Sequence, residues 1–252
     1  MKIKDIYDYL DSISPFDTQE KWDNSGLIVG SFDDTIKNVY ISLDLDLKMI
    51  KDIKPKSLII THHPLIFSPL KKINNDSYST KILKKLIKKD ISLISMHTNI
   101  DKSHLNMYVG REVLGFDFSK SRLSSCKQVD DFVLTADVDM SLKKLQKIVK
   151  EKLNIKILKT VKSKKHIKTV ALTTGAGMSL LPYVKADCFL TGDIKYHEAM
   201  ESIARKVTLL DIGHYESEIH FTTLLNGLMK NYLKNNDKKA IILASQNPFD
   251  YK

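Results

Sequence analysis

The chain has 252 residues, of which 42% are hydrophobic and 28% are charged, and its formal net charge is +10. This composition is ordinary for a globular protein of one large domain or two compact lobes. No segment approaches the roughly 18 uninterrupted apolar residues of a membrane helix, so we expect a soluble protein with no membrane partner. The N-terminal segment interleaves aspartates with isoleucines at helical spacing, unlike a secretory signal, and we therefore expect a cytoplasmic protein.

The positions of the cysteines and lysines limit the kinds of metal ligand and of binding partner to be expected. Cys126 and Cys188 lie far apart without a partner at C-x-x-C spacing, so they indicate neither a disulfide framework nor a cysteine-built zinc site. Any bound metal must therefore use histidine and carboxylate ligands. The lysines are scattered in short groups such as Lys84-Lys85, which favours solvated helix faces. Nucleic acid or another polyanionic partner is the weaker alternative.

Taken in chain order, the hydrophobic pattern alternates helices with strands and indicates an α/β fold. In the first half it predicts helices near 2–12, Thr80–Lys88 and Leu105–Leu114, and strands at Val39–Leu43, Leu58–Ile60 and Ile91–Ser95. In the second half it predicts a helix near Leu142–Leu153 and strands at Val133–Ala136, Ile155–Thr160, Thr169–Thr173, Cys188–Leu190 and Thr208–Leu210. We expect an N-terminal lobe over 1–125 and a C-terminal lobe over 126–252, whose last helix and strand could pack back on the first lobe.

The order of elements in the first half recurs in the second half. The strand Val39–Leu43 returns as Thr169–Thr173, and the segments His97–Asp101 and His214–Glu218 each follow a strand with the same His-x-x-x-carboxylate spacing. A two-lobed pseudo-repeat is favoured over the chance likeness of α/β units. In that arrangement, the two His-x-x-x-carboxylate pairs face one another across a cleft between two similar lobes.

Histidines and carboxylates stand at the ends of predicted strands, where ligands bind in α/β sheets. Three segments share this position: Thr61-His62-His63, His97–Asp101 and His214–Glu218. Neighbouring side chains on a strand point to opposite faces, so His62 and His63 could share a site only where the strand ends, which Pro64 favours. The i, i+4 spacing places each remaining imidazole and its carboxylate on one side of a turn entering a helix.

This donor set mixes neutral nitrogen with anionic oxygen, which suits Zn, Fe, Mn or Ni better than Ca or Mg. A single strand-end histidine is more often structural than ligating. Six donors at three strand ends, in a chain with eight histidines, favour a site for two divalent metal ions. Two ions about 3.5–4 Å apart would activate water and polarise a substrate, so we expect a metal-dependent hydrolase.

Four side chains near these segments are candidates for supporting roles. His97 and His197 are the candidates for moving a proton as general acid or base, although His197 fits a surface histidine at a helix start equally well. Asp44 and Asp46 alternate on one side of a strand. Asp44 could orient a ligating histidine, whereas Asp46 is the more plausible cap of the next helix.

Two glycine-containing segments each allow two interpretations. The amides of Gly175-Ala176-Gly177 could cradle a phosphate at a helix N-terminus, but a tight strand-to-helix turn is favoured. The segment Trp22–Gly26 could line a pocket or form an Asp-Asn turn, and the turn is again favoured.

At these residues the sequence resembles the NIF-three-like family, whose members are named GTP cyclohydrolase I type 2 homologues. The resemblance covers nearly the whole chain. Its motifs are Trp22–Gly30, Ser42–Asp44, Thr61–Phe67, His97–Asp101, Gly175–Gly177, Thr191–Asp193 and Gly213-His214. The sequence departs from the family at Asp193, where glutamate is more usual after Thr-Gly.

The resemblance implies a two-lobed α/β fold, a toroidal homohexamer and a binuclear metal site. Its ligands would fall on His62, His63, Asp101, His214 and Glu218, with His97 as a partner near the site. The implied substrate is a small molecule, a nucleotide or related heterocycle, with ring opening of GTP as the suggested reaction. The alternative function is a non-catalytic metal-binding scaffold, or a metal-handling or regulatory interaction protein.

Overall fold

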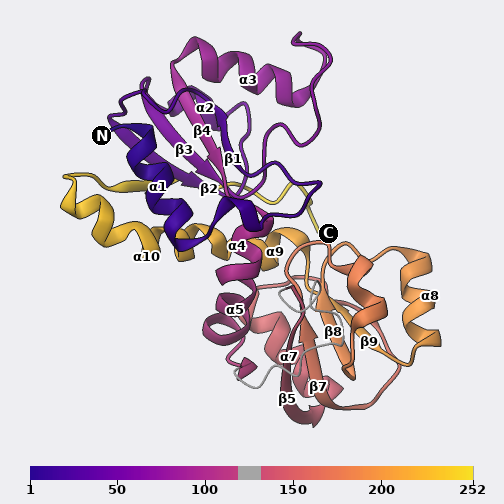
Figure 1. Cartoon of the computed structure of the whole chain (residues 1–252). Helices are drawn as coiled ribbons and strands as arrows, with labels where there is room; N and C mark the ends of the chain where they lie inside the picture. Colours follow the sequence, from indigo (N-terminus) through magenta and orange to yellow (C-terminus); the bar gives the residue numbers. More distant parts are fainter. Residues whose placement is uncertain (119–131, 252) are drawn as a thin grey trace. The chain divides into compact units, whose positions relative to one another are not determined.

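The computed structural model describes residues 1–118 and 132–251, which form two compact α/β units (Figure 1). The first unit comprises Met1–Ile100 and Phe221–Gln246, and the second begins at Asp101, runs to His220 and includes the chain after Gln246. Each unit contains one five-stranded sheet, which confirms the α/β fold class. The boundary expected between residues 125 and 126, together with Cys126, lies outside the described residues.

The sheet of the first unit places the ends of two central strands side by side. Its strand order is β1-β4-β3-β2-β10, in which β10, β2, β3 and β4 run parallel and β1 is antiparallel to β4. The strands are β1 (Gly26–Val29), β2 (Asn38–Ser42), β3 (Ser57–Thr61), β4 (Ile91–Ser95) and β10 (Ala240–Ile242). Because Thr61 pairs with Ser95, β3 and β4 end at the same edge of the sheet.

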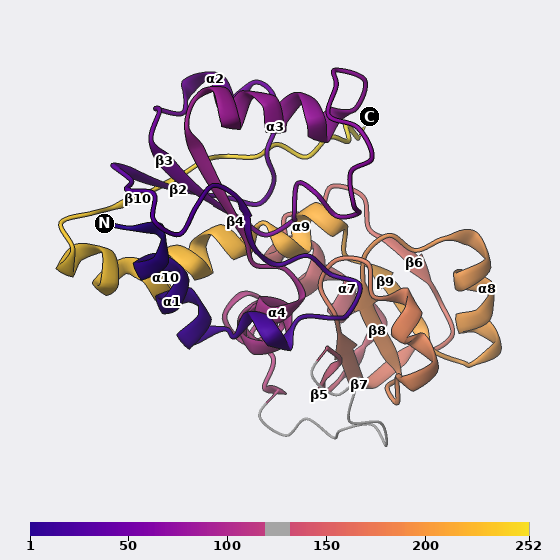
Figure 2. The same cartoon turned by 45° about the horizontal axis from the view of Figure 1, so that its top comes forward.

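Helices cover both faces of this sheet, as the uninterrupted burial of β3 and β4 requires. On one face, α2 and α3 pack on Ile59 and Leu93. On the other, α1 and α10 lie side by side (Figure 2), and Tyr9 stacks on Tyr232 with ring centroids 4.0 Å apart. The helices are α1 (Ile3–Ile13), the 3-10 turn η1 (Phe16–Thr18), α2 (Met49–Asp52), α3 (Tyr78–Lys88) and α10 (His220–Asn235).

The segment after β4 turns helical at Thr98, earlier than the predicted start at Leu105. The polar run His-Thr-Asn-Ile-Asp lacks the apolar periodicity on which that prediction depended. Two of its turns are π-helical, a variant that occurs mostly as single turns and often at functional sites. The elements are α4 (Thr98–Ile100), the π-helical η2 (Asp101–Leu105), α5 (Asn106–Tyr108) and the π-helical η3 (Val109–Val113).

The sheet of the second unit has the order β5-β7-β8-β9-β6, with three parallel central strands and an antiparallel strand at each edge. The strands are β5 (Leu134–Ser141), β6 (Lys159–Val161), β7 (His166–Leu172), β8 (Cys188–Thr191) and β9 (Thr208–Asp211). The strand predicted over Ile155–Thr160 is wrong in extent, because the β6 edge pairs with β9 only over Lys159–Val161.

Helices also flank the second sheet. The helix α7 contacts β5 and β7, whereas α8 contacts β9 and β6. Phe189 of β8 is fully buried in a core that includes Met178 and Leu181. The helices are α7 (Leu142–Lys152), the 3-10 helix η5 (Met178–Tyr183), α8 (Tyr196–Ala204) and α9 (His214–Glu218). Across residues 1–118 and 132–251, no helix is both long and apolar enough to span a membrane.

The two sheets share a three-stranded parallel core in the same chain order. In the first unit, β2, β3 and β4 lie in sequence across the sheet, and an antiparallel strand, β1, follows β4. In the second unit, β7, β8 and β9 lie in sequence, and the antiparallel β6 follows β9. The pseudo-repeat predicted from the sequence is therefore present in the strand topology of the two units.

Candidate metal centre

Three histidine side chains gather where β3 and β4 end in the first unit. The ring centroids of His62 and His63 lie 4.9 Å apart, and His97 lies 5.1 Å and 5.4 Å from them. One ring nitrogen of each residue lies within 4.8 Å of the others. The backbone amides of His62 and His63 both donate to the carbonyl of Leu43, so the chain has left the regular strand ladder there. Neutral imidazole nitrogens gathered in this way can hold a divalent metal.

Each of these imidazoles has its Nδ1 atom beside an oxygen atom. The distances are 2.8 Å from His62 to the carbonyl of Met96, 2.9 Å from His63 to Asp44 and 2.8 Å from His97 to Asp23. Metal-binding histidines almost always donate their other ring N–H to a carbonyl or carboxylate, which sets the tautomer and the ring orientation. Nε2 is therefore the atom that each ring could offer to a metal or to a substrate.

The carboxylate of Asp23 connects His97 to the start of α4. Its side chain is fully buried, and one oxygen lies against His97 while the other accepts hydrogen bonds from the amide and hydroxyl of Thr98 and from the hydroxyl of Ser25. Burial by itself raises the pKa of Asp23, but the hydrogen bonds and charge of His97 and the hydrogen bonds from Thr98 outweigh it and hold the pKa well below its usual range. Asp23 therefore stays ionised.

The two aspartates that follow β2 take the roles expected from the sequence. Asp44 lies against Nδ1 of His63 and orients that ring. Asp46 accepts hydrogen bonds from the amides of Lys48 and Met49, both at 2.7 Å, and so caps the start of α2. The cap predicted for Asp46 is confirmed, although both aspartates follow β2 instead of alternating on a strand. Metal binding by the His63 ring that Asp44 holds stays a prediction.

The second unit presents a histidine and a carboxylate on one turn of α9. Nε2 of His214 lies 3.0 Å from an oxygen of Glu218, so the i, i+4 spacing places the two groups together as predicted. Nδ1 of His214 lies 2.7 Å from Asp193. Asp193 has a φ of 55°, a left-handed conformation that aspartate tolerates better than most residues. This pair could contribute nitrogen and oxygen ligands to a metal.

The segment Gly175-Ala176-Gly177 lies against Glu218 and forms a turn. The amide of Gly175 donates to the hydroxyl of Ser217 at 3.0 Å, and that of Gly177 donates to the hydroxyl of Thr191 at 2.8 Å. Both amides are already bonded to side-chain hydroxyls of the protein, which supports the turn over the phosphate cradle. Gly175 has a φ of 62°, and a Cβ there would come within 2.0 Å of Oε1 of Glu218. Glycine is therefore needed both for the backbone and for the position of the carboxylate.

Asp101 and His197 are the two further residues of the predicted site. Asp101 begins η2, and His197 is exposed in the first turn of α8 with its ring edge-on to Tyr196. Within the described part of the chain, neither belongs to a group of three donors whose ligand atoms lie within 4.8 Å of one another. Metal binding by Asp101 and proton transfer by His197 stay predictions.

Sequence reasoning missed three residues that shape these groups: Asp23, Gly175 and Ser217. The sequence places Asp23 only in a turn, because its partner His97 lies far away in the chain. The sequence also places Gly175 in a turn but does not indicate its contact with Glu218. No local pattern in the sequence signals these partners, because each contact joins segments that are distant along the chain.

The fold and these side chains define a class of protein: paired α/β sheets with histidine and carboxylate groups that could hold a metal. The family described as Duf34/NIF3 (NGG1p interacting factor 3) matches residues 1–248, and the chain belongs to this family. The resemblance inferred from the motifs is thus confirmed.

Named relatives and solved structures agree with this assignment. The chain is 46% identical over 252 residues to a GTP cyclohydrolase 1 type 2 homolog of Campylobacter jejuni, covering 100% of both proteins. It is 39% identical to GTP cyclohydrolase 1 type 2 of Helicobacter pylori, covering 91% of this chain and 92% of that protein. The crystal structure of Staphylococcus aureus protein SA1388 matches with a TM-score of 0.85 and 28% identity, over 100% of this chain and 99% of that one. Reduced HcgD from Methanocaldococcus jannaschii matches with a TM-score of 0.80 and 28% identity, over 96% and 98%.

Proposed function

We propose that the chain is a divalent-metal-dependent hydrolase that acts on a nucleotide or a related heterocycle. The observation that carries this proposal is the group of His62, His63 and His97, in which each Nδ1 lies beside an oxygen. Such an Nδ1 partner is typical of metal-binding histidines and supports the proposal. Because one relative is named GTP cyclohydrolase 1 type 2 and another is named a homolog of it, GTP is the first substrate to test.

We further propose that two metal ions are bound, and the donor types fit this number. The ligands would be His62, His63, Asp101, His214 and Glu218. Imidazole nitrogens with carboxylate oxygens suit Zn, Fe, Mn or Ni. When bound, such ions would act as Lewis acids and lower the pKa of water.

Within this proposal, His97 moves the proton. Asp23 holds Nδ1 of His97, which leaves Nε2 as the atom that accepts or donates a proton to a substrate. The ionised Asp23 also stabilises the protonated imidazole that proton transfer creates. His197, exposed on α8, is the second candidate for the same task.

The test combines metal content with turnover. We expect purified protein to contain stoichiometric divalent metal and to turn over GTP or a phosphoester, whereas His63→Ala and Glu218→Ala lose both properties. His166→Ala is the matched control, since His166 is an exposed histidine held by Asp139. Metal-loaded wild type that matches both variants in every assay would overturn the enzyme proposal. Stoichiometric metal without turnover would support the scaffold alternative, and no metal after reloading would overturn the site.

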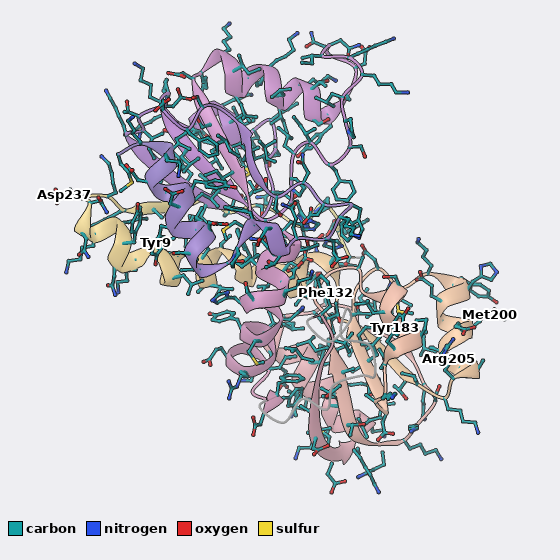
Figure 3. The ribbon with its side chains drawn as sticks, viewed as in Figure 1. Tyr9, Phe132, Tyr183, Met200, Arg205 and Asp237 are labelled. Atoms are coloured by element: carbon teal, nitrogen blue, oxygen red, sulfur yellow. The ribbon has the colours of Figure 1, made fainter. Side chains whose placement is uncertain are left out.

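We also propose that copies of the chain assemble with one another, as the family resemblance implies for a homohexamer. The helix α8 exposes Tyr196, Met200 and Ile203 at helical spacing, and Figure 3 labels Met200 on this helix. Exposed apolar side chains that are grouped in this way often mark an interface. Light scattering should give a hexameric mass for the wild type and a smaller one for Met200→Glu. A monomeric wild type would contradict the proposal.

A further inference from the structure

Two large aromatic side chains stand exposed beside the histidine group of the first unit. Trp22 is 57% exposed and Phe67 is 49% exposed. Their ring centroids lie 5.8 Å apart, and they lie 6.1 Å and 6.3 Å from the ring of His97, each at a steep angle to it. Exposed aromatic faces that cluster at a polar site are uncommon unless they bind something.

Hydrogen bonds hold the two segments that carry these rings. Asp23, next to Trp22, is buried and bonded to Thr98 and Ser25. The side-chain amide of Asn24 donates to the carbonyl of Ile66 at 2.5 Å, which joins the Trp22 segment to the segment that ends at Phe67. The rings are therefore positioned in advance, and a ligand that stacks on them loses little free energy to ordering.

The geometry of the rings selects a flat ligand. Their planes are tilted by 47°, so a planar molecule can stack on one ring while its edge meets the other. Trp22 offers the larger and more exposed face. Because every nucleobase has a π face, such a surface supplies affinity for heterocycles without reading hydrogen bonds. This explains how a purine could be held although the sequence shows no guanine-reading element.

We propose that Trp22 and Phe67 form a stacking surface for a planar heterocycle of the purine class, which directs the ring edge toward His97 and its neighbouring imidazoles. The inference rests on the proposed hydrolase function, since it names the substrate class of the same site. In this arrangement the aromatic rings bind the substrate, and the imidazoles take part in the reaction.

The chain offers a direct reporter for this surface, because Trp22 is its only tryptophan. The full chain is titrated with guanosine, GTP and tripolyphosphate, both as purified and after metal removal, while tryptophan fluorescence is recorded with correction for absorption by the base. We expect saturable quenching by guanosine and GTP and none by tripolyphosphate. By calorimetry, Trp22→Leu should weaken GTP binding about tenfold, the lower part of the range for loss of one stacked base.

Matched variants separate stacking from general disruption. Trp22→Phe keeps an aromatic face and should retain most of the affinity, whereas Phe249→Leu removes another exposed aromatic ring and should change nothing. Quenching by tripolyphosphate equal to that by GTP, or a Trp22→Leu variant that binds GTP as tightly as the wild type, would overturn the stacking surface.

Comparing the fluorescence titration with metal content and GTP turnover distinguishes the stacking surface from the hydrolase function. Saturable guanosine quenching in a protein that neither holds metal nor turns over GTP would refute the hydrolase and support the stacking surface. Metal-dependent GTP turnover with the same KM in wild type and Trp22→Leu would support the hydrolase and refute the stacking surface.

Discussion

The buried carboxylate of Asp23 lies 2.8 Å from Nδ1 of His97 and also accepts hydrogen bonds from Thr98, the first residue of α4. One side chain thus orients the imidazole of His97 and also accepts a hydrogen bond from the first backbone amide of α4. The position of His97 therefore depends on the Trp22–Ser25 segment as well as on β4.

Replacing Asp23 should slow proton transfer by His97. We expect Asp23→Asn to lower GTP turnover about 10–100-fold, because partners that orient a site histidine typically contribute that much. Turnover is compared in preparations with the same metal content. Asp17→Asn, at an exposed aspartate of η1, should leave turnover unchanged. Equal turnover by wild type and Asp23→Asn would show that proton transfer by His97 does not depend on this contact.

Gly175→Ala should displace the carboxylate of Glu218. The added methyl group would collide with Oε1 of Glu218, and the left-handed backbone would cost alanine roughly 1–2 kcal/mol. Gly115→Ala is the control, since Gly115 has a φ of 77° and nothing lies within 4 Å of the place that its Cβ would take. Denaturant unfolding should show a loss of stability for both variants, and a larger loss for Gly175→Ala because of the collision. Metal analysis should show a loss only for Gly175→Ala, and retained metal would remove Glu218 from the proposed ligands.

Phe221 should stabilise the core and also hold the ring of His62 in place. Its ring is fully buried and lies 5.1 Å from the ring of His62 at an angle of 35°. We expect Phe221→Ala to cost about 3–5 kcal/mol of unfolding free energy, as for other large core truncations. Phe189→Ala, in the core of the second unit, should cost a similar amount but leave the NMR signals of His62 in place. Unshifted His62 signals in Phe221→Ala would contradict the packing role.

Asp187 should make the second unit sensitive to acid. Burial raises the pKa of Asp187. Hydrogen bonds from Lys164 and from the amides of Lys168 and Thr169, together with the charge of Lys164, lower this pKa by a larger amount. The net pKa is therefore below the usual value. A folded-state pKa below the unfolded value of about 3.9 contributes stability above that pH, and this stability is lost as the pH falls through the folded-state pKa.

We therefore expect Asp187→Asn to be less stable at neutral pH by about 1–3 kcal/mol and to lose less stability on acidification than the wild type. Denaturant unfolding from about pH 2 to about pH 7, a range that extends below the unfolded-state pKa, measures both effects. Asp237→Asn, at an exposed position after α10, is the control (Figure 3). Parallel stability curves for wild type and Asp187→Asn would show that this carboxylate contributes nothing that depends on its charge.

The fold class and the candidate donors were accessible from the sequence because both depend on local pattern. Buried parallel strands such as β3 appear as continuous apolar runs, and their ends are marked by polar residues such as His62. The His214–Glu218 pair follows from helical spacing alone. The earlier helix start at Thr98 and the short β6 were missed, since a polar helix start and an edge strand carry little periodicity.

By itself, the sequence determined the α/β class, the strand ends that carry His62, His63 and His97, and the family to which the chain belongs. Only the tertiary structure decided which oxygen holds each ring, that Gly175 must lack a side chain beside Glu218, and that Trp22 and Phe67 lie together next to His97. Contacts of this kind join segments that are distant along the chain. Their distances depend on strand register and packing, which no local pattern of residues specifies.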